Sequence, residues 1–264
     1  MDRDAYIDFA GVSFAYAQGG APILAGLNLS LRQSEFFMLL GPSGCGKTTV
    51  LNLLAGFEAP SSGSIQLAGK PIGGPGVERA VIFQGDDSLL GWLSAVDNVE
   101  FGLRVAGVPR QERRRRAVQA LQLVGLGGQG QKLPHELSGG MKQRVQIARA
   151  LVGQSEVLLM DEPFAALDAQ TRSTLQDELS RLWVGTPRTV LFITHDISEA
   201  IILGDRIGVM RAGPGSRIKE IVVNDLPRPR RRGDPLFGAL YDRIEGAVAE
   251  EVRRSKQGEM VAGE

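Results

Sequence analysis

The feature that most constrains how this chain folds is a glycine-rich run, Gly41-Pro42-Ser43-Gly44-Cys45-Gly46-Lys47-Thr48-Thr49. The apolar residues 36–40 before it predict a buried strand, and residues 50–55 after it predict a helix. A glycine-rich turn between a strand and a helix is the setting of a phosphate-binding loop. Its glycines permit positive φ angles, so its backbone N–H groups can surround an anion at the positive end of the helix dipole.

The side chains of this loop suit a nucleoside triphosphate with its metal ion. Lys47 is expected to reach the β- and γ-phosphates as a point charge, and the Thr48 hydroxyl is expected to bind Mg²⁺. A glycine-rich turn without a ligand is the alternative, and the spacing of Lys47 and Thr48 argues against it. Cys45 fills a variable position, where we interpret it as a small residue tolerated beside the phosphates.

Composition limits what the chain can be. With 264 residues and 43% hydrophobic content, it is long enough for one large α/β domain with appendages. Lys and Arg together number 30, as do Asp and Glu, so no overall charge favours a nucleic-acid partner. The acidic start is unlike a signal peptide, and no apolar run approaches the roughly 20 residues that span a bilayer. A single cysteine fits the reducing cytoplasm, and we expect membrane association only through a partner.

Apolar patterns on both sides of the loop predict the strands of the domain. The alternation in residues 6–17 and 27–31 is typical of half-exposed strands in an antiparallel sheet. Tyr16, near the first of these, is a candidate for stacking on an adenine ring, and an ordinary strand aromatic is the equal alternative. Further strands are predicted at residues 64–67, 80–83, 157–160, 189–194 and 206–210.

Helical patterns fill the middle of the chain. Residues 93–107 and the stretch after them show helical spacing of apolar residues. We therefore expect an inserted helical subdomain over about residues 88–150. Its four consecutive arginines, 113–116, favour a solvated or subunit-facing surface over nucleic acid, because the net charge is zero. The main domain is predicted over residues 5–240, and a separate C-terminal helical tail over residues 241–264.

Polar residues follow several of the predicted strands. Gln84, the acidic pair Asp161-Glu162, and His195 each stand directly after one. Open α/β sheets bind ligands at the carboxyl ends of their parallel strands. Taken alone, either acid could be a buried ion-pair partner, and His195 could be a satisfied strand-end histidine. Together they predict a site at that edge of the sheet.

A second motif resembles the signature of a known family. The run Leu137-Ser138-Gly139-Gly140-Met141-Lys142-Gln143-Arg144 precedes an apolar helix pattern, and its serine and glycines suit a capped helix start that is open to an anion. With the phosphate loop, the strand-end residues and Ala165-Ala166-Leu167-Asp168, it resembles the full complement of the ABC ATPases in chain order. The resemblance extends to about residue 240. It implies an α/β fold with a P-loop NTPase (RecA-like) core, an antiparallel β subdomain and the inserted helical subdomain.

The resemblance to ABC ATPases implies a role for each strand-end residue. Asp161 would hold Mg²⁺, Thr48 would ligate the same ion, and the Gln84 amide oxygen would complete its shell. Glu162 would act as the general base on the attacking water. His195 would contact the γ-phosphate and hold the geometry of attack. The predicted catalytic residues are therefore Glu162, His195 and Gln84, with ATP and Mg²⁺ as cofactors.

The resemblance also implies a second copy of the chain. Two copies would face head to tail, so that each ATP lies between one phosphate loop and the other copy's signature. The signature residues expected to contact that ATP are Ser138, Gly139, Gly140 and Gln143, and Asp168 is the D-loop residue. A plain capped helix is the alternative for this motif.

The stretch after Gln84 is expected to meet a membrane partner. In ABC transporters the residues after that glutamine touch a coupling helix of the permease, so residues 88–92 are the predicted docking patch. Exposed Leu89 and Trp92 would suit a partner surface, and core packing is the alternative. The chain would then lie at the cytoplasmic face of the cell membrane, peripheral through permease subunits, with a periplasmic or extracellular solute-binding protein as an indirect partner.

Finer similarities point to one group of importers. The run from Leu51 to Gln84 and Gly213-Pro214-Gly215 resemble the nitrate, sulfonate and taurine importer ATPases, with the taurine-import proteins most similar. Gly91 stands where that group usually has proline, and Met141-Lys142 replaces the glutamine-led form of the taurine proteins. The resemblance implies ATP hydrolysis coupled to import of taurine or a related sulfonate. An importer ATPase for nitrate or another small anion, and a soluble ABC ATPase not coupled to transport, are the alternatives.

Overall fold

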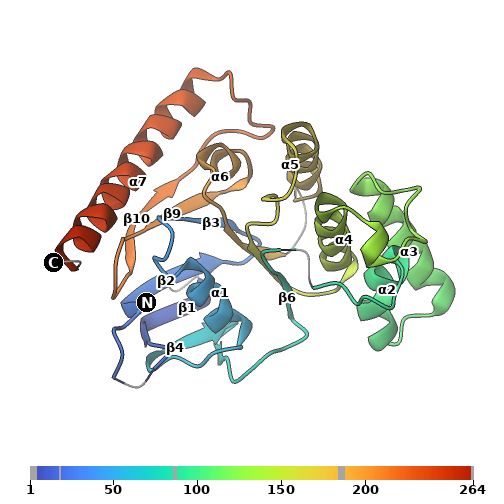
Figure 1. The fold of residues 1–264 in the computed structure, drawn as a ribbon, viewed down its shortest axis with the longest axis horizontal. Coiled ribbons are helices and arrows are strands. Elements are labelled where there is room, and N and C mark those ends of the chain that lie inside the picture. The colour runs from blue at the N-terminus through green and yellow to red at the C-terminus, as the bar shows by residue number, and fades with distance from the viewer. Residues whose placement is uncertain (1–4, 18, 86–87, 184–187, 263–264) are drawn as a thin grey trace.

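The computed structural model describes residues 5–17, 19–85, 88–183 and 188–262 of the chain. Two β-sheets, with helices packed around the larger one, make up this part of the molecule (Figure 1). Within it, no helix has the length and apolarity needed to cross a bilayer.

The smaller sheet lies at the N-terminal side and is antiparallel, with the order β2-β1-β4-β5. Along β1, Ile7 and Phe9 are buried while Asp8 between them is half-buried, as the alternating sequence predicts. The strands are Ala5–Phe14 (β1), Leu24–Arg32 (β2), Ser62–Leu67 (β4) and Lys70–Pro71 (β5).

The larger sheet has the order β10-β9-β3-β8-β7-β6, and all its pairings are parallel except that of β10 with β9. Every residue of β3, β7 and β8 is buried, which explains their continuous apolar runs. Successive residues of β3 face opposite sides, so Phe36 and Met38 join one core cluster and Phe37 and Leu39 the other. The strands are Phe36–Leu40 (β3), Arg79–Ile82 (β6), Val157–Asp161 (β7), Thr189–Ile193 (β8), Arg206–Met210 (β9) and Ile218–Val223 (β10).

Strand order brings the predicted site residues to one edge. The phosphate loop follows β3, His195 closes the turn after β8, Glu162 follows β7, and Gln84 lies just beyond β6. These four strands are neighbours in the sheet and run parallel, so their carboxyl ends lie side by side. Residues far apart in the chain therefore meet at one edge of the sheet.

Helices connect the strands of the larger sheet. Helix α1, Lys47–Ala55, begins at the phosphate loop. Three α-helices lie between β6 and β7 in the chain and pack against one another, set off to one side of the sheet (Figure 1): Ala95–Val105 (α2), Arg110–Leu123 (α3) and Gly139–Val152 (α4). They fall in the region predicted as the helical subdomain. The remaining helices before the C-terminal one are Pro134–Glu136 (the short 3-10 helix η1), Ala169–Trp183 (α5) and Ile197–Leu203 (α6).

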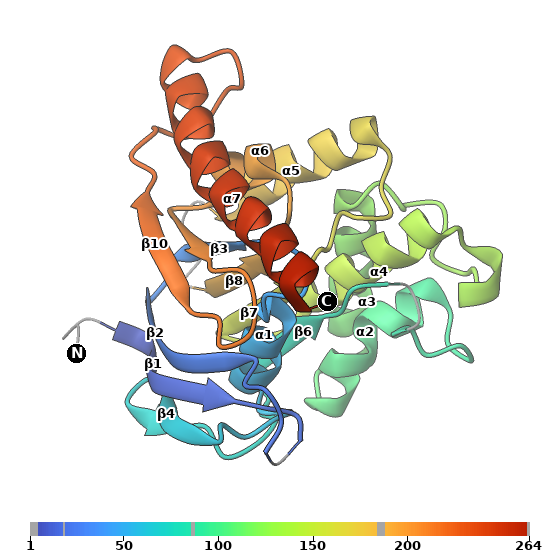
Figure 2. The same cartoon turned by 60° about the vertical axis from the view of Figure 1, so that its left-hand side comes forward.

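The C-terminal helix differs from the sequence prediction. Helix α7, Pro235–Ala262, begins before residue 241, because Asp234 Oδ1 accepts a hydrogen bond from Leu236 N at 2.9 Å and caps its first turn. Its buried side chains include Phe237 and Ile244, and it packs against α6 and β9 (Figure 2). The prediction of a separate tail is therefore wrong in this respect, since α7 is part of the core packing.

Candidate functional site

The phosphate loop has the backbone geometry that its glycines predict. Gly44 and Gly46 have φ angles of 76° and 90°, in the left-handed region that favours glycine. A Cβ at Gly46 would also lie 3.0 Å from side-chain atoms of Ile23 and Leu24, which pack under the loop. Lys47 Nζ donates to the carbonyls of Gly41 and Pro42, at 2.8 and 2.9 Å. The loop therefore encloses a positive charge where the motif expects phosphate.

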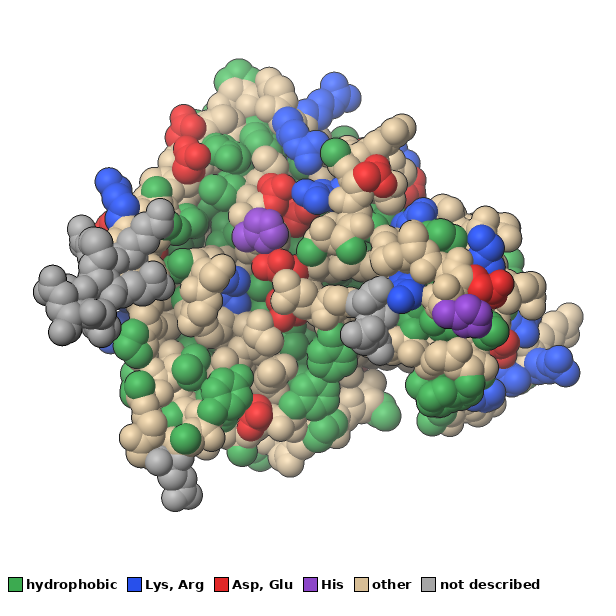
Figure 3. Space-filling view, viewed as in Figure 1, with side chains coloured by type: hydrophobic (Ala, Val, Ile, Leu, Met, Phe, Trp, Pro, Cys, Tyr) green, Lys and Arg blue, Asp and Glu red, His purple; other side chains and the backbone are tan. Residues whose placement is uncertain are grey.

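A cavity of about 740 Å³ lies over this loop. Its lining includes residues 40–43, Lys47, Gln84, Glu162 and His195. Its volume falls within the roughly 300–1,000 Å³ typical of small-molecule sites. Figure 3 shows a histidine beside acidic side chains near the middle of one face of the molecule. One cavity thus joins the phosphate loop to the strand-end residues.

Thr48 and Asp161 form an oxygen-rich pair at the base of the loop. Thr48 Oγ1 donates to Asp161 Oδ2 at 2.7 Å, and Asp161 is only 5% exposed. Burial raises the pKa of Asp161, and the charge of Glu162 adds to that rise, while the Thr48 hydrogen bond and Lys47 oppose it. A hydroxyl and a carboxylate are hard oxygen ligands of the kind Mg²⁺ prefers, and a cation would stabilise the buried charge. These residues therefore fit Mg²⁺.

Glu162 lies at the centre of the strand-end residues. Gln84 Nε2 donates to Glu162 Oε2 at 3.2 Å, and His195 Nδ1 lies 3.2 Å from Glu162 Oε1. Each carboxylate oxygen is thus held by a different strand end. The φ angle of Glu162 is 46°, which is uncommon for a residue with a side chain and costs on the order of 1–3 kcal/mol. Its backbone N–H donates to Ile193 O at 3.0 Å, which keeps the residue in this conformation.

A polar network, which the sequence analysis did not predict, supports the His195 turn. Thr194 Oγ1 donates to Glu199 Oε2 at 2.6 Å and accepts from Asp196 N at 3.0 Å. Asp196 caps α6 through the N–H of Glu199. Arg172 Nη2 donates to Leu167 O at 3.1 Å and its Nε lies 3.8 Å from Glu199 Oε1. Arg172 thus connects the segment before Asp168 with the turn that carries His195.

The signature residues lie at the start of α4. Ser138 caps this helix by accepting from Met141 N at 3.3 Å, as its position predicts. Ser138 is exposed, Gly139 and Gly140 are half-buried, and the three lie outside the lining of the cavity described above. This placement leaves the start of α4 on the surface of the described chain.

The position of Gln143 differs from the sequence prediction that it contacts ATP on a second copy. It is 1% exposed, and its side-chain amide is engaged within its own chain. Its Nε2 donates to Glu162 O at 3.2 Å, and its Oε1 accepts from Ala166 N at 3.0 Å. A buried amide with both ends bonded cannot reach ATP on another copy. Gln143 instead ties α4 to the backbone beside the candidate base.

Two further predicted residues lie beside these elements. Asp168 Oδ1 accepts from Thr171 N at 2.9 Å at the start of α5, and this bond lowers the pKa of Asp168. The Tyr16 hydroxyl lies 3.4 Å from Thr49 Oγ1, and its ring makes an edge contact with Phe14. Tyr16 is 64% exposed, so its ring is accessible beside the end of the phosphate loop. Its stacking on adenine stays a prediction.

Cys45 is packed inside the loop. It is 1% exposed, and burial raises the pKa of its thiol while Lys47 opposes the rise. Its Sγ would lie 2.8 Å from a Cβ placed at Gly41, so the thiol fills the space left by that glycine. The side chain acts as a small packing residue.

The predicted docking patch, residues 88–92, is only partly exposed. Trp92 is 76% exposed, but Leu89 packs against the core cluster, so the expectation that Leu89 is exposed is wrong. Arg149 Nη1 donates to Ser88 O at 2.9 Å, and buried Asn98 holds Leu90 through two hydrogen bonds. The segment is therefore fixed to α2 and α4 while it presents Trp92.

The chain is similar to known ATP-binding proteins of ABC transporters. The family model described as ABC transporter matches residues 24–165. The Taurine import ATP-binding protein TauB of Chromobacterium violaceum is 52% identical over 241 residues, covering 88% of this chain and 92% of that protein. An uncharacterized ABC transporter ATP-binding protein of Methanocaldococcus jannaschii is 47% identical, covering 88% of this chain and 86% of its own.

Solved structures agree with this match. A dimeric, post-hydrolysis ATP-binding cassette bound to ADP and Pi superposes with a TM-score of 0.72 at 28% identity, covering 84% of this chain and all of that one. CbiO1 of Clostridium perfringens, part of an ABC transporter complex, gives 0.73 at 30% identity, covering 84% of this chain and 89% of its own. The predicted fold class is confirmed. The chain belongs to the ABC transporter family, as an ATP-binding protein of that family.

Proposed function

We propose that this chain is the ATP-hydrolysing, energy-coupling subunit of an ABC importer for taurine or a related sulfonate. The observation that carries the hydrolytic part is the position of Glu162, held between Gln84 and His195 in the cavity of the phosphate loop. The solute rests on the similarity to the taurine-import proteins.

The geometry supports a hydrolytic sequence. The loop N–H groups and Lys47 bind the β- and γ-phosphates. Mg²⁺, bound by Thr48 and Asp161 with Gln84 as the third expected ligand, would neutralise charge that develops on the phosphates. Glu162 accepts a proton from the water that attacks the γ-phosphate, and ADP and phosphate leave. Gln84 and His195 hold the two carboxylate oxygens, so the base needs little reorientation in the reaction.

The arrangement of the signature supports a dimer of two copies. Ser138, Gly139 and Gly140 start a helix whose N–H groups suit an anion, yet they lie outside the chain's own cavity. A second copy placed head to tail would bring them to the γ-phosphate. Loss of that phosphate would then reopen the dimer, which is how hydrolysis would move a membrane partner.

The membrane partner is proposed to be a permease that docks on Trp92. A bulky exposed aromatic on a rigid segment is typical of a partner contact. The chain would be peripheral at the cytoplasmic face of the membrane, and a solute-binding protein would act on it through the permease. Those two partners contact the solute, so the ATPase alone does not choose between taurine, other sulfonates and nitrate.

The test is ATP hydrolysis by the chain alone and after reconstitution with a permease and solute-binding protein of a taurine importer from the same organism. Taurine, alkanesulfonates and nitrate are added in turn, with a Lys47→Ala chain as the inactive control. We expect stimulation by taurine or an alkanesulfonate. Stimulation by nitrate alone would show that the transported solute is nitrate rather than a sulfonate. A turnover rate that neither the permease nor any solute changes would show that the chain is an ATPase not coupled to import.

A further inference from the structure

Helix α7 forms one wall of the nucleotide cavity. Val248, Val252 and Ser255 line the cavity that also holds Lys47 and Glu162. The spacing of these three residues places them on one face of the helix. Figures 1 and 2 show α7 running alongside β10 and β9. We call residues 245–255 of α7 the strap.

Polar contacts attach the strap to the hairpin of β9 and β10. Glu251 is 1% exposed, and its Oε2 accepts from Ala212 N at 2.9 Å, just beyond β9. Lys219 Nζ, from β10, lies 3.3 Å from Glu251 Oε1 and 2.7 Å from Glu250 Oε2. The same ammonium donates to Ala247 O at 3.0 Å. The strap is thus attached to this hairpin through the buried carboxylate of Glu251 and the ammonium of Lys219.

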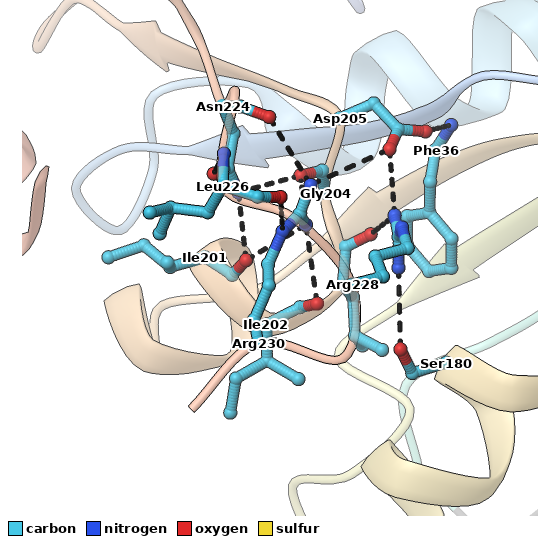
Figure 4. Close-up of polar contacts among 11 residues, drawn as sticks. Phe36, Ser180, Ile201, Ile202, Gly204, Asp205, Asn224, Leu226, Arg228 and Arg230 are labelled. Atoms are coloured by element: carbon cyan, nitrogen blue, oxygen red, sulfur yellow. Dashed lines mark hydrogen bonds and ion pairs between the residues drawn. The ribbon is translucent and has the colours of Figure 1, made fainter. Parts of the chain in front are cut away.

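The linker before α7 is also anchored, through two arginines. Figure 4 shows the linker before α7, where Arg230 Nη1 donates to Ile201 O at 3.0 Å and to Gly204 O at 2.7 Å, at the end of α6. Arg228 Nη2 lies 2.7 Å from Asp205 Oδ1, and Asp205 Oδ2 accepts from Phe36 N at 2.9 Å. These contacts fix the linker to the elements that begin after His195 and lead into the phosphate loop.

The strap lies where the second copy must act. In the proposed dimer, the partner's signature has to reach the γ-phosphate across the cavity of Lys47, Glu162 and His195. The strap forms a wall of that cavity beside these residues, so it narrows the space through which the signature of the second copy would approach. We propose that the strap is an autoinhibitory element, which must leave the cavity before a second copy of this chain closes on ATP. This inference rests on the proposed head-to-tail dimer.

The strap and the signature of the second copy would therefore compete for the same cavity. Val248 packs against the core cluster and holds the strap on the cavity wall, where Val252 lies beside it, while ATP shared with the other copy's signature favours release of the strap. Weakening the apolar contact should therefore lower the ATP concentration needed for dimerisation. The affinity of a single copy for ATP is measured alongside, because Val248 and Val252 line the nucleotide cavity.

The experiment compares dimerisation in a Glu162→Gln background, in which we expect ATP to bind without being hydrolysed. The strap variant carries Val248→Ser and Val252→Ser, and the matched control carries Leu236→Ser, on the same helix but 64% exposed. Sedimentation velocity gives the dimer fraction at increasing ATP. We expect half-dimerisation of the strap variant at about tenfold lower ATP than the control, as loss of part of a buried valine contact allows.

A second measurement keeps the test independent of variant folding. Hydrogen exchange of the amides of residues 245–255 is followed in the Glu162→Gln chain with and without ATP. We expect those amides to exchange faster once the dimer forms. The proposal that the strap is autoinhibitory would be overturned if the strap variant and the control reached half-dimerisation at the same ATP concentration. It would also be overturned if these amides stayed protected in the dimer. Solute stimulation of the reconstituted ATPase is read separately, so failure of the strap leaves the importer role standing.

Discussion

At the scale of single residues, the carboxylate of Glu162 is held on both oxygens in a backbone conformation that side chains seldom adopt. Strain of this kind persists only where surrounding contacts maintain it, and here Ile193 O, Gln84 and His195 do so. Such preorganisation is what a positioned base requires.

Replacement of Glu162 by Gln tests this assignment. We expect ATP binding to persist while turnover falls about a hundredfold or more, because the amide cannot accept the proton of the attacking water. Nucleotide affinity and steady-state hydrolysis are measured on the same preparation, with exposed Glu136→Gln as the control. Turnover close to that of the unaltered chain would remove Glu162 from the role of base.

Glu199, below the His195 turn, makes stability depend on pH. Burial raises the pKa of Glu199 above its ordinary value of 4.5, with Asp196 adding to the rise, while Thr194 and Arg172 lower it. The folded chain therefore binds this proton more tightly than the unfolded chain does. The stability that this group contributes is fully present below pH 4.5 and is lost as pH rises through the raised pKa.

The Glu199→Gln chain should lack that loss. Urea unfolding across the range from pH 4.5 upward should show the free energy of unfolding of the unaltered chain falling relative to that of the variant. The difference between the two chains isolates Glu199 from other carboxylates. Parallel curves over this range would show that the proton is bound equally in both states.

At the scale of elements, α6 links the candidate site to the segment that leads into the C-terminal helix. Its first turn is capped by Asp196, next to His195, and its last carbonyls accept from Arg230. Burial lowers the pKa of Arg230 to about 10, and the nearby Arg228 charge adds to that effect, while Asp205 opposes it. A buried guanidinium surrounded by carbonyls therefore serves as the C-terminal cap of this helix.

Arg230→Met should destabilise the chain by about 1–3 kcal/mol, because the guanidinium's hydrogen bonds to these carbonyls are lost in a partly buried place, and Ile201 O and Gly204 O keep only their bonds from Asn224 Nδ2. The control is Arg231→Met, since the neighbouring Arg231 is exposed. Midpoints of urea unfolding, compared at equal slope, measure the difference. Equal midpoints for the two variants would contradict the capping role.

At the scale of the whole molecule, one face carries a rigidly held aromatic outside the nucleotide cavity. Asn98 and Arg149 fix the segment of residues 88–92, so Trp92 is presented without a further ordering cost. A separate stacked pair, Phe57 and Phe83, is also partly exposed, with ring centroids 5.8 Å apart. Exposed aromatics of this kind are typical of contact surfaces.

Trp92→Ala should weaken assembly with the permease by about 2 kcal/mol or more, as loss of an interface anchor does. Nucleotide binding should be unchanged, because Trp92 lies outside the cavity lining. The measurement is co-purification with the permease used in the reconstitution, with the exposed Val77→Ala chain as control. Recovery equal to that of the control would place the contact elsewhere.

The sequence alone determined the local features. The phosphate loop, the buried strands β3, β7 and β8, and the capped start of α4 at Ser138 depend on neighbouring residues, whose periodicity and turn chemistry are readable in the chain. Residues at strand ends were also recognisable, because parallel strands place their carboxyl ends at one edge. Strand β10 was not predicted from the sequence, since its residues are mostly half-buried and lack a clear alternation of buried and exposed positions.

Only the tertiary structure decided which distant groups share a contact. It placed Gln143 inside the chain, Arg230 on the end of α6, and Val252 in the nucleotide cavity. Residues more than a hundred positions apart, such as Val252 and Lys47, meet only through the packing of whole elements. Local propensity and periodicity carry no record of that packing, because it depends on the shape and burial of every surface that α7 and the sheet present to each other.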